Sequence, residues 1–278
     1  MAFNIKAVLE YIMTRIIDSH CHIYPEKIAQ KAAAATNTFY DELSPKSHDG
    51  TVRMLLESGK KAGIDGFVVH SVATTPHQVS SINHFIAESV KNSNGAFTGL
   101  GAMHQDSDDQ ERDIEEIIAL GLKGVKLHPD IQKFEADSIK AFRMYELIED
   151  RGLPLLIHAG DYRYDYSNPD RIAHILRAFP KMTVIAAHLG GWSKWEEAAR
   201  ILPDYPNVMV DTSSSFFGLT HEMARKIIRL YGADRVMFGT DYPMWMQQGD
   251  IDFLNSLDLT EEEYEKIYWK TCTNLYEK

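Results

Sequence analysis

Residues 16–25 read IIDSHCHIYP, a short apolar run that passes directly into two histidines. An apolar run with little polar alternation is typical of a strand that is buried on both faces of a parallel sheet. The turn from His20 to Pro25 contains no glycine, whereas a doubly wound nucleotide-binding sheet would show a glycine-rich turn at this point. The segment therefore favours a barrel of parallel strands over an open sheet.

Seven further apolar runs follow, each separated from the next by an amphipathic segment. Gly121 and Gly152 stand just past two of these segments, as expected at helix ends. Eight strands that alternate with helices predict an α/β fold, a (β/α)₈ TIM barrel. We expect one barrel domain over residues 16–278, preceded by an N-terminal extension over residues 1–15. The predicted strands are residues 16–18, 66–69, 97–101, 124–127, 155–157, 183–186, 208–210 and 236–238.

The composition argues against several classes of protein. The 278 residues include 29 Lys and Arg against 40 Asp and Glu, a net charge of −11. This charge argues against general binding of nucleic acid or of anionic membrane surfaces. No stretch approaches the ~20 apolar residues of a transmembrane helix. Two cysteines, Cys21 and Cys272, do not make a disulfide framework, so we expect a cytoplasmic location.

Ionisable side chains follow every predicted strand. The carboxyl ends of barrel strands meet at one mouth, where barrel enzymes place their catalytic residues. His20 and His22 are two residues apart on a strand and project to the same side, so both imidazoles could bind one metal ion. The strand-end residues are His20, His22, His70, His104, Lys126, His128, His158, His188, Asp211 and Asp241.

Five motifs at these strand ends resemble those of the amidohydrolase superfamily. The similarity is greatest to the amidohydrolase-related branch that includes aminocarboxymuconate-semialdehyde decarboxylase. The motifs follow one another from the first strand to the eighth, so the resemblance covers nearly the whole chain after Arg15. They are DSHCH at 18–22, GVKLHP at 124–129, LIHAG at 156–160, AHLGG at 187–191 and GTDYP at 239–243.

The resemblance implies one divalent metal ion at the barrel mouth. Its ligands would be His20, His22, His158 and Asp241. Three imidazoles and a carboxylate suit zinc best, with manganese, iron or cobalt as substitutes. The ion would lower the pKa of a bound water to about 7. In the family pattern Asp241 accepts the proton of this water, and His188 is catalytic because it polarises the substrate or moves a proton.

Lys126 leaves a second arrangement open. In two-metal members of the superfamily, a lysine on this strand is carboxylated and bridges both ions, and the histidines matching His158 and His188 hold the second ion. One-metal relatives also keep a lysine here. We favour one metal ion, with Lys126 as a contact for a substrate carboxylate.

Four other side chains are predicted to contact a small-molecule substrate. His128 shares the strand face of Lys126, and Tyr24 and Trp192 are placed to form walls of the site. Arg163 lies in a tyrosine-rich loop, and its guanidinium could bind a carboxylate through two hydrogen bonds. The irregular segment at 31–49 is expected to form a lid or a short additional helix.

The motifs fit two reactions. The first, which we favour, is metal-dependent hydrolysis of a small amide, ester or lactone by an activated water. The second is metal-dependent non-oxidative decarboxylation of a small, for example aromatic, carboxylic acid. A barrel that binds metal without catalysis is disfavoured, because His188 and Asp241 are present at the catalytic positions alongside the ligand histidines. The family pattern also implies a homodimer.

Overall fold

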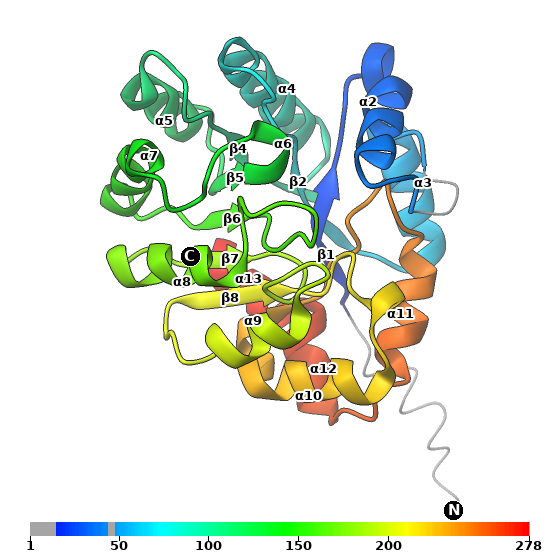
Figure 1. Ribbon diagram of the computed structural model, residues 1–278. Coiled ribbons are helices and arrows are strands. Elements are labelled where there is room, and N and C mark those ends of the chain that lie inside the picture. Colours follow the sequence, from blue (N-terminus) through cyan, green and yellow to red (C-terminus); the bar gives the residue numbers. More distant parts are fainter. Residues whose placement is uncertain (1–14, 44–47, 278) are drawn as a thin grey trace, which may run out of the picture.

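Short parallel strands line the centre of the protein in the computed structural model (Figure 1), which describes residues 15–43 and 48–277. The predicted N-terminal extension therefore lies outside the described residues, except for Arg15. The strands confirm the eight predicted runs, except that Leu100 divides the third run in two. They are β1 (Ile17–His22), β2 (Gly66–His70), β3 (Phe97–Gly99), β4 (Gly101–Ala102), β5 (Val125–Leu127), β6 (Leu155–Ile157), β7 (Val184–Ala186), β8 (Val208–Asp211) and β9 (Val236–Met237).

The strand pairs form two sheets, ordered β1-β2-β3 and β4-β5-β6-β7-β8-β9. At one junction Leu100 lies between β3 and β4, and its backbone N–H donates to Val69 on β2 at 2.9 Å. At the other junction the backbone N–H of Ser19 on β1 donates to the carbonyl of Phe238 at 2.8 Å, and that of Asp241 donates to His20 at 3.0 Å. The chain itself connects the sheets at the first junction and the bonds of Ser19 and Asp241 connect them at the second, so the fold is that of a TIM barrel.

Helices cover the outside of the strands (Figure 1). Several begin at a Ser or Thr whose side chain accepts a backbone N–H of the first turn, as at Thr51, Ser138 and Thr220. Gly121 and Gly152 follow helix ends with φ of 72° and 63°, which confirms their predicted role. The helices are α2 (Glu26–Phe39), α3 (Val52–Ala62), α4 (Val79–Asn92), α5 (Gln110–Ala119), α6 (Pro129–Gln132), α7 (Ile139–Asp150), α8 (Pro169–Ala178), α9 (Trp195–Ile201), α10 (His221–Tyr231), α11 (Gln247–Asn255), α12 (Glu261–Glu265) and α13 (Thr271–Tyr276), with short helical turns η1 (Pro76–Gln78), η2 (Phe216–Gly218), η3 (Ala233–Arg235) and η4 (Lys266–Lys270).

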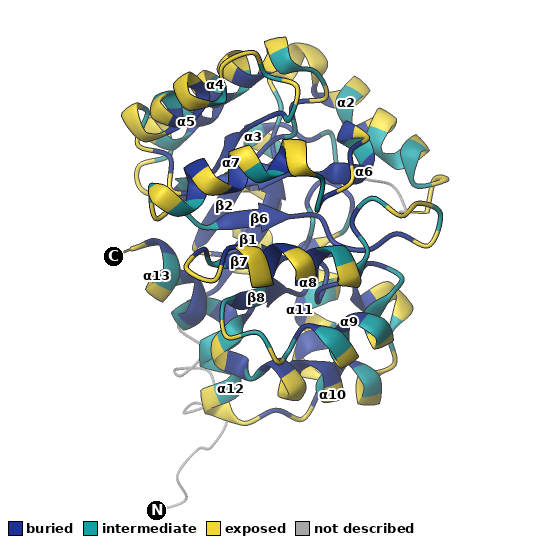
Figure 2. Cartoon of the chain, turned by 60° about the vertical axis from the view of Figure 1, so that its left-hand side comes forward, coloured by how far each residue is buried: buried dark blue, intermediate teal, exposed yellow. Residues whose placement is uncertain are grey.

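The core has two layers because successive strand residues face opposite sides of the barrel wall. The larger layer lies between strands and helices, where Val69, Leu127 and Ile157 pack. The smaller layer includes Val68 and Leu156 and continues to α13. Figure 2 shows the strands buried and the outward faces of the helices exposed. None of the helices in the described segments has the length and apolar character needed to cross a bilayer.

The segment at 31–49 contributes to a long helix rather than to an irregular loop. Helix α2 leaves β1 after Pro25 and continues to Phe39. Its residues line one side of a cavity of about 620 Å³ at the barrel mouth. The structure thus bears out an additional helix at the mouth, although residues 44–47 lie outside the described part of the chain.

Candidate metal centre

Three side chains from the two ends of the chain converge at the barrel mouth. His20 and His22 lie on β1, and Asp241 follows β9, which adjoins β1. Nε2 of His20 and Nε2 of His22 each lie 3.4 Å from Oδ1 of Asp241. Two ligands that each lie at about 2.1 Å from a tetrahedral zinc ion are about 3.4 Å apart. Each of these two distances is therefore the distance expected between two ligands of one ion.

Asp211 at the end of β8 holds the ring of His20 in one tautomer. Its Oδ2 accepts a hydrogen bond from Nδ1 of His20 at 2.9 Å, and its Oδ1 accepts from the backbone N–H groups of His188 and Ser213, each at 3.1 Å. Burial alone would raise the pKa of Asp211, but the charge and hydrogen bond of His20 lower it below its usual range. With the proton on Nδ1, Nε2 of His20 presents a lone pair to the mouth, as in carboxylate–histidine–metal arrangements.

Asp18 ties β1 to the segment that carries Asp241. Its carboxylate accepts from Thr240 through the hydroxyl at 2.6 Å and the backbone N–H at 3.0 Å, and from the backbone N–H of His20 at 3.3 Å. Asp18 is fully buried, which raises its pKa to about 6. It does not contact the ring of either β1 histidine in these bonds, so its role is to position the two segments.

The other two predicted residues of the centre, His158 after β6 and His188 after β7, pair with each other. Nδ1 of His158 lies 2.9 Å from Nε2 of His188, and the outer nitrogens of the pair face the carbonyls of Gly160 at 3.0 Å and Ser213 at 2.9 Å. These three contacts need three ring protons, and two neutral imidazoles supply two. Burial lowers the pKa of both rings, so the shortage persists near neutral pH. A metal ion on one nitrogen would relieve it, because a coordinating nitrogen needs no proton.

A third imidazole packs beneath the β1 pair. The ring of His70, at the end of β2, stands edge-on to those of His20 and His22, with centroids 4.7 and 4.5 Å apart. Among the described residues, neither nitrogen of His70 has a hydrogen-bond partner, and neither does Nδ1 of His22. Buried polar atoms nearly always have a partner. His20, His22 and His70 offer ligand atoms that lie within 4.8 Å of one another, and the same holds for two further groups of described residues that could bind a metal ion: His20, His188 and Asp211, and His128, Asp130 and His158.

Both residues predicted to be catalytic have a strained backbone, as do eight other non-glycine residues among those the structure describes. His188 has φ of 61° and Asp241 has φ of 64°, a left-handed conformation that non-glycine residues rarely adopt. Such strain persists where surrounding structure enforces it, and it is found mostly at functional sites. Gly160 shows how closely the loops meet here, because a Cβ on it would lie 2.7 Å from the Cα of Gly191. This close approach brings the segments of His158 and His188 together.

Lys126 of β5 lies inside the ring of histidines. Its Nζ is 3.1 Å from Nε2 of His20, and the side chain is almost fully buried. Burial lowers the pKa of Lys126 to about 8, against the opposing charges of Asp241 and Asp211. A lysine with so low a pKa holds an exchangeable proton near neutral pH. This position is compatible with both predicted roles, a contact for a substrate carboxylate and a site of carboxylation.

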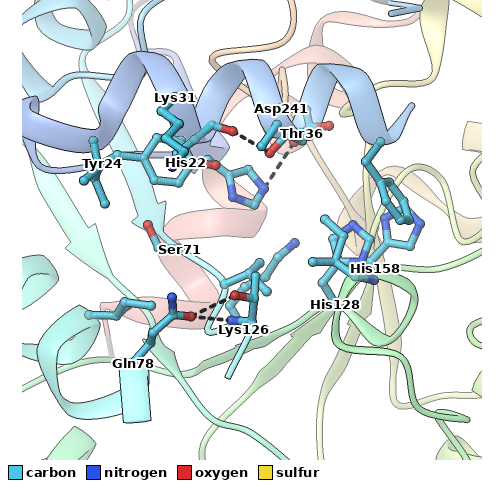
Figure 3. Close-up of a pocket in the computed structure, with 18 of the residues that line it drawn as sticks. His22, Tyr24, Lys31, Thr36, Ser71, Gln78, Lys126, His128, His158 and Asp241 are labelled. Atoms are coloured by element: carbon cyan, nitrogen blue, oxygen red, sulfur yellow. Dashed lines mark hydrogen bonds and ion pairs between the residues drawn. The ribbon is translucent and has the colours of Figure 1, made fainter. Parts of the chain in front are cut away.

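The predicted substrate contacts divide into two groups. Tyr24, Lys126 and His128 line a cavity of about 620 Å³ that opens above the histidines, and Figure 3 shows them around it. Trp192 lines a smaller adjoining recess with His158, His188 and Asp241. Arg163 lines neither of these two cavities.

Arg163 instead fastens the end of α2. Its Nε and one terminal nitrogen donate to the two carboxylate oxygens of Asp161 at 3.0 and 2.7 Å, and the other terminal nitrogen donates to the carbonyl of Phe39. The guanidinium also lies 4.9 Å from the ring centroids of Phe39 and Tyr40. Its charge is thus neutralised by Asp161, and the residue holds the helix in place over the cavity.

Sequence reasoning missed two residues of the site. The hydroxyl of Tyr40, just past α2, lies 2.8 Å from Nε2 of His128, and the ring lines both cavities. Asp130, two residues past His128, is buried with its Oδ2 3.7 Å from Nε2 of His158, and burial raises its pKa to about 7. Its place directly after the GVKLHP motif was the available signal. For Tyr40 no signal existed, because only the fold brings α2 to the mouth.

A family model described as Amidohydrolase matches residues 17–278 of the chain. No curated protein sequence matches it significantly. Among solved structures, an uncharacterised TIM-barrel protein from Bordetella bronchiseptica is 22% identical, with a TM-score of 0.78 over 94% of this chain and 98% of that one.

Two further structures are similar in fold. A dihydroxybenzoic acid decarboxylase from Polaromonas sp. JS666, with bound manganese and the inhibitor 2-nitroresorcinol, is 16% identical, with a TM-score of 0.71 over 95% of this chain and 97% of that one. A protein from Pseudomonas putida, described as a candidate 2-pyrone-4,6-dicarboxylic acid hydrolase, is 17% identical, with a TM-score of 0.67 over 94% of this chain and 97% of that one. At these identities the likeness concerns the fold.

Proposed function

The chain belongs to the amidohydrolase family of enzymes, and from this premise we propose that it is a metal-dependent hydrolase of a small amide, ester or lactone. The observation that carries the proposal is the spacing of 3.4 Å between Asp241 and each of His20 and His22. His158 completes the proposed ligand set. The donor set suits zinc, and manganese is a close second because a decarboxylase of the same fold binds it.

A bound divalent ion would activate a water molecule and polarise the carbonyl of the substrate. The chain itself provides the proton transfers. Oδ2 of Asp241 accepts from the hydroxyl of Ser214 at 2.6 Å, and Ser214 in turn accepts from Nε1 of Trp245 at 2.7 Å. These bonds fix the carboxylate so that Oδ1 faces the β1 histidines. Burial would raise the pKa of Asp241, but the hydrogen bond from His22 and nearby histidines lower it well below its usual range, so the carboxylate is ionised and acts as a base.

His188 is the proposed second proton carrier. The carbonyl of Ser213 accepts from its Nδ1 at 2.9 Å, and this bond keeps the ring proton on the side away from the cavity. Nε2 is therefore the nitrogen that exchanges protons with a leaving group. An imidazole suits this step because one ring nitrogen can accept a proton while the other donates one.

Decarboxylation is the second candidate function. Lys126 favours it, because this buried amine lines the cavity beside His20 and could bind a carboxylate that leaves as carbon dioxide. The fold similarity to a dihydroxybenzoic acid decarboxylase points the same way. In that reaction Nε2 of His188 would serve to protonate the carbon that loses the carboxylate.

The two candidates are separated by parallel assays on apo-protein and on protein reloaded with zinc or manganese. One panel contains small lactones, esters and amides, scored by carbonyl hydrolysis; the other contains hydroxylated benzoic acids, scored by release of carbon dioxide. Metal-dependent hydrolysis without carbon dioxide release supports the hydrolase. Metal-dependent carbon dioxide release alone overturns it in favour of the decarboxylase, and activity that is independent of metal overturns both.

His188→Asn tests the proton transfer in whichever assay responds. We expect the metal to stay bound and kcat to fall by about 10²–10⁴. His104→Asn is the matched control, because His104 also ends a barrel strand but lies outside both cavities. A kcat for the His188 variant equal to that of the control would contradict its role, and loss of a metal ion would favour the two-metal arrangement.

A further inference from the structure

The cavity is much larger than the metal centre needs. Its volume of about 620 Å³ is within the range of sites that enclose drug-sized ligands. Lys31 of α2, an exposed residue, also lines the cavity, but the imidazoles, Lys126 and Asp241 are gathered at one end (Figure 3). From there the cavity extends between α2 and the η1–α4 segment, and Figure 3 shows α2 along one side and Gln78 of η1 on the opposite side.

Helix α2 presents an apolar stripe to this extension. Ile28, Ala32, Ala35 and Phe39 all line the cavity, and their spacing of four, three and four residues places them on one face of the helix. The stripe covers a rise of roughly 16 Å, which is longer than one aromatic ring. The side chain of Ile28 is 51% exposed, so nothing in the described chain covers this end of the stripe. An uncovered apolar stripe inside a cavity is typical of a ligand surface.

The opposite wall adds apolar surface and few free polar groups. Ile82 and Phe85 of α4 face the cavity. The polar side chains between them and the metal centre already bond within the chain. The hydroxyl of Ser71 donates to the carbonyl of Ile23, and Oε1 of Gln78 accepts from the backbone N–H of Thr74 at 2.8 Å. The extension therefore offers mainly apolar contact, with the exposed Lys31 as a charged group on its α2 wall.

We propose that the extension between α2 and α4 is a subsite for an elongated aliphatic chain, and that the substrate is an acyl or alkyl compound whose head group reaches the metal centre. This inference rests on the metal centre of the proposed function. The apolar stripe and the proposed metal ligands line the same cavity, so one molecule can contact both. The length of the stripe favours a chain over a single ring.

Straight-chain hydroxamates are suitable probes because the hydroxamate head chelates a divalent ion whichever reaction the enzyme catalyses. Acetohydroxamate, hexanohydroxamate and octanohydroxamate are titrated into cobalt-loaded protein, with calorimetry for affinity and the visible cobalt spectrum for head-group binding. We expect Kd to fall about fourfold for each added methylene group, and the heat capacity change to become more negative with chain length.

Two variants of α2 test whether the dependence of Kd on chain length arises at the apolar stripe. Ala32→Asp places a charge in the stripe and should weaken octanohydroxamate by at least about tenfold, while acetohydroxamate is unchanged. Ala34→Asp is the matched control, because Ala34 is exposed and lies outside the cavity lining. Ile28→Ser provides a second variant at an exposed position, should the Ala32 variant fail to fold.

The outcomes are distinguishable. A chain-length dependence that is lost in Ala32→Asp and Ile28→Ser but kept in Ala34→Asp supports the subsite. Equal affinity for all three hydroxamates, with the cobalt spectrum responding to each, overturns the subsite and leaves the metal centre intact. Equal weakening in the Ala34 control also overturns it. No response of the cobalt spectrum to acetohydroxamate overturns the metal centre, and the subsite with it.

Discussion

Replacing Asp211 with Asn should weaken metal binding although Asp211 is not a proposed ligand. Its carboxylate has no proton, so both oxygens accept: Oδ2 from His20, and Oδ1 from two backbone N–H groups at 3.1 Å. An asparagine has one acceptor and one donor at these positions. If the amide oxygen faces His20, the NH₂ group opposes the two backbone donors. If the NH₂ group faces His20, the ring proton moves to Nε2, which then cannot coordinate a metal.

The second orientation changes the tautomer of His20 directly, and the first removes the acceptor of the backbone N–H groups of His188 and Ser213, which hold the side chain in place. Removal of such a supporting carboxylate usually weakens metal affinity by about 10–100-fold. This corresponds to about 1.4–2.8 kcal/mol, at 1.36 kcal/mol for each factor of ten. We expect Asp211→Asn to fall in this range, with part of the loss appearing as lower stability because two buried donors lose their acceptor.

The assay is competition for zinc between apo-protein and a chromophoric chelator, with urea unfolding of both apo-proteins measured in parallel. Asp161→Asn is the matched control, because Asp161 is also fully buried beside the mouth but pairs with Arg163 rather than with a histidine. The reasoning would be refuted if the Asp211→Asn variant bound zinc as tightly as the wild-type protein does. Equal loss of affinity in the Asp161 variant would also refute it, because the effect would then reflect general loosening of the mouth.

Two further predictions concern Arg163 and Lys126. Arg163→Met should lower the free energy of unfolding by about 2 kcal/mol in urea titrations. The substitution leaves the carboxylate of Asp161 buried without its ion-pair partner and removes the donor to the carbonyl of Phe39. Unchanged stability would show that other contacts hold α2 in place. If Lys126 contacts the substrate as an amine, protein reloaded in bicarbonate-free buffer should bind about one zinc ion and show no response to added bicarbonate. Two ions and activation by bicarbonate would instead support a carboxylated Lys126.

The strands were predictable because their positions are encoded locally. Each is a nearly continuous apolar run, and the structure has a strand at all eight runs, although β1 continues past its predicted run to His22. The break at Leu100 was not predictable from the run itself. It lies between Gly99 and Gly101, where a Cβ would come within 2.9 Å of Ile86 and 2.5 Å of Ile117. The glycines let α4 and α5 approach the barrel closely, which is a tertiary requirement.

The position of the site was predictable, but its internal contacts were not. Strand order alone brings His20, His22 and Asp241 to one mouth. The bond between His20 and Asp211 joins residues 191 apart in sequence, so only the fold reveals which carboxylate orients which ring. The pairing of His158 with His188 is likewise a tertiary contact. An additional helix was one of the two forms expected for the segment at 31–49, but its start at Glu26 and its apolar stripe were not predicted, because only two alanines of the helix are buried in the core.

The central claim is that His20, His22 and Asp241 hold one divalent ion at the barrel mouth. The most direct measurement is the metal content of protein purified with supplemented zinc or manganese, compared with Ala variants of the three residues and with His104→Ala as the control. The account predicts about one ion per chain in the wild-type protein and the control, and near-complete loss in the three variants. Wild-type protein without metal, or variants that keep the full amount, would contradict it.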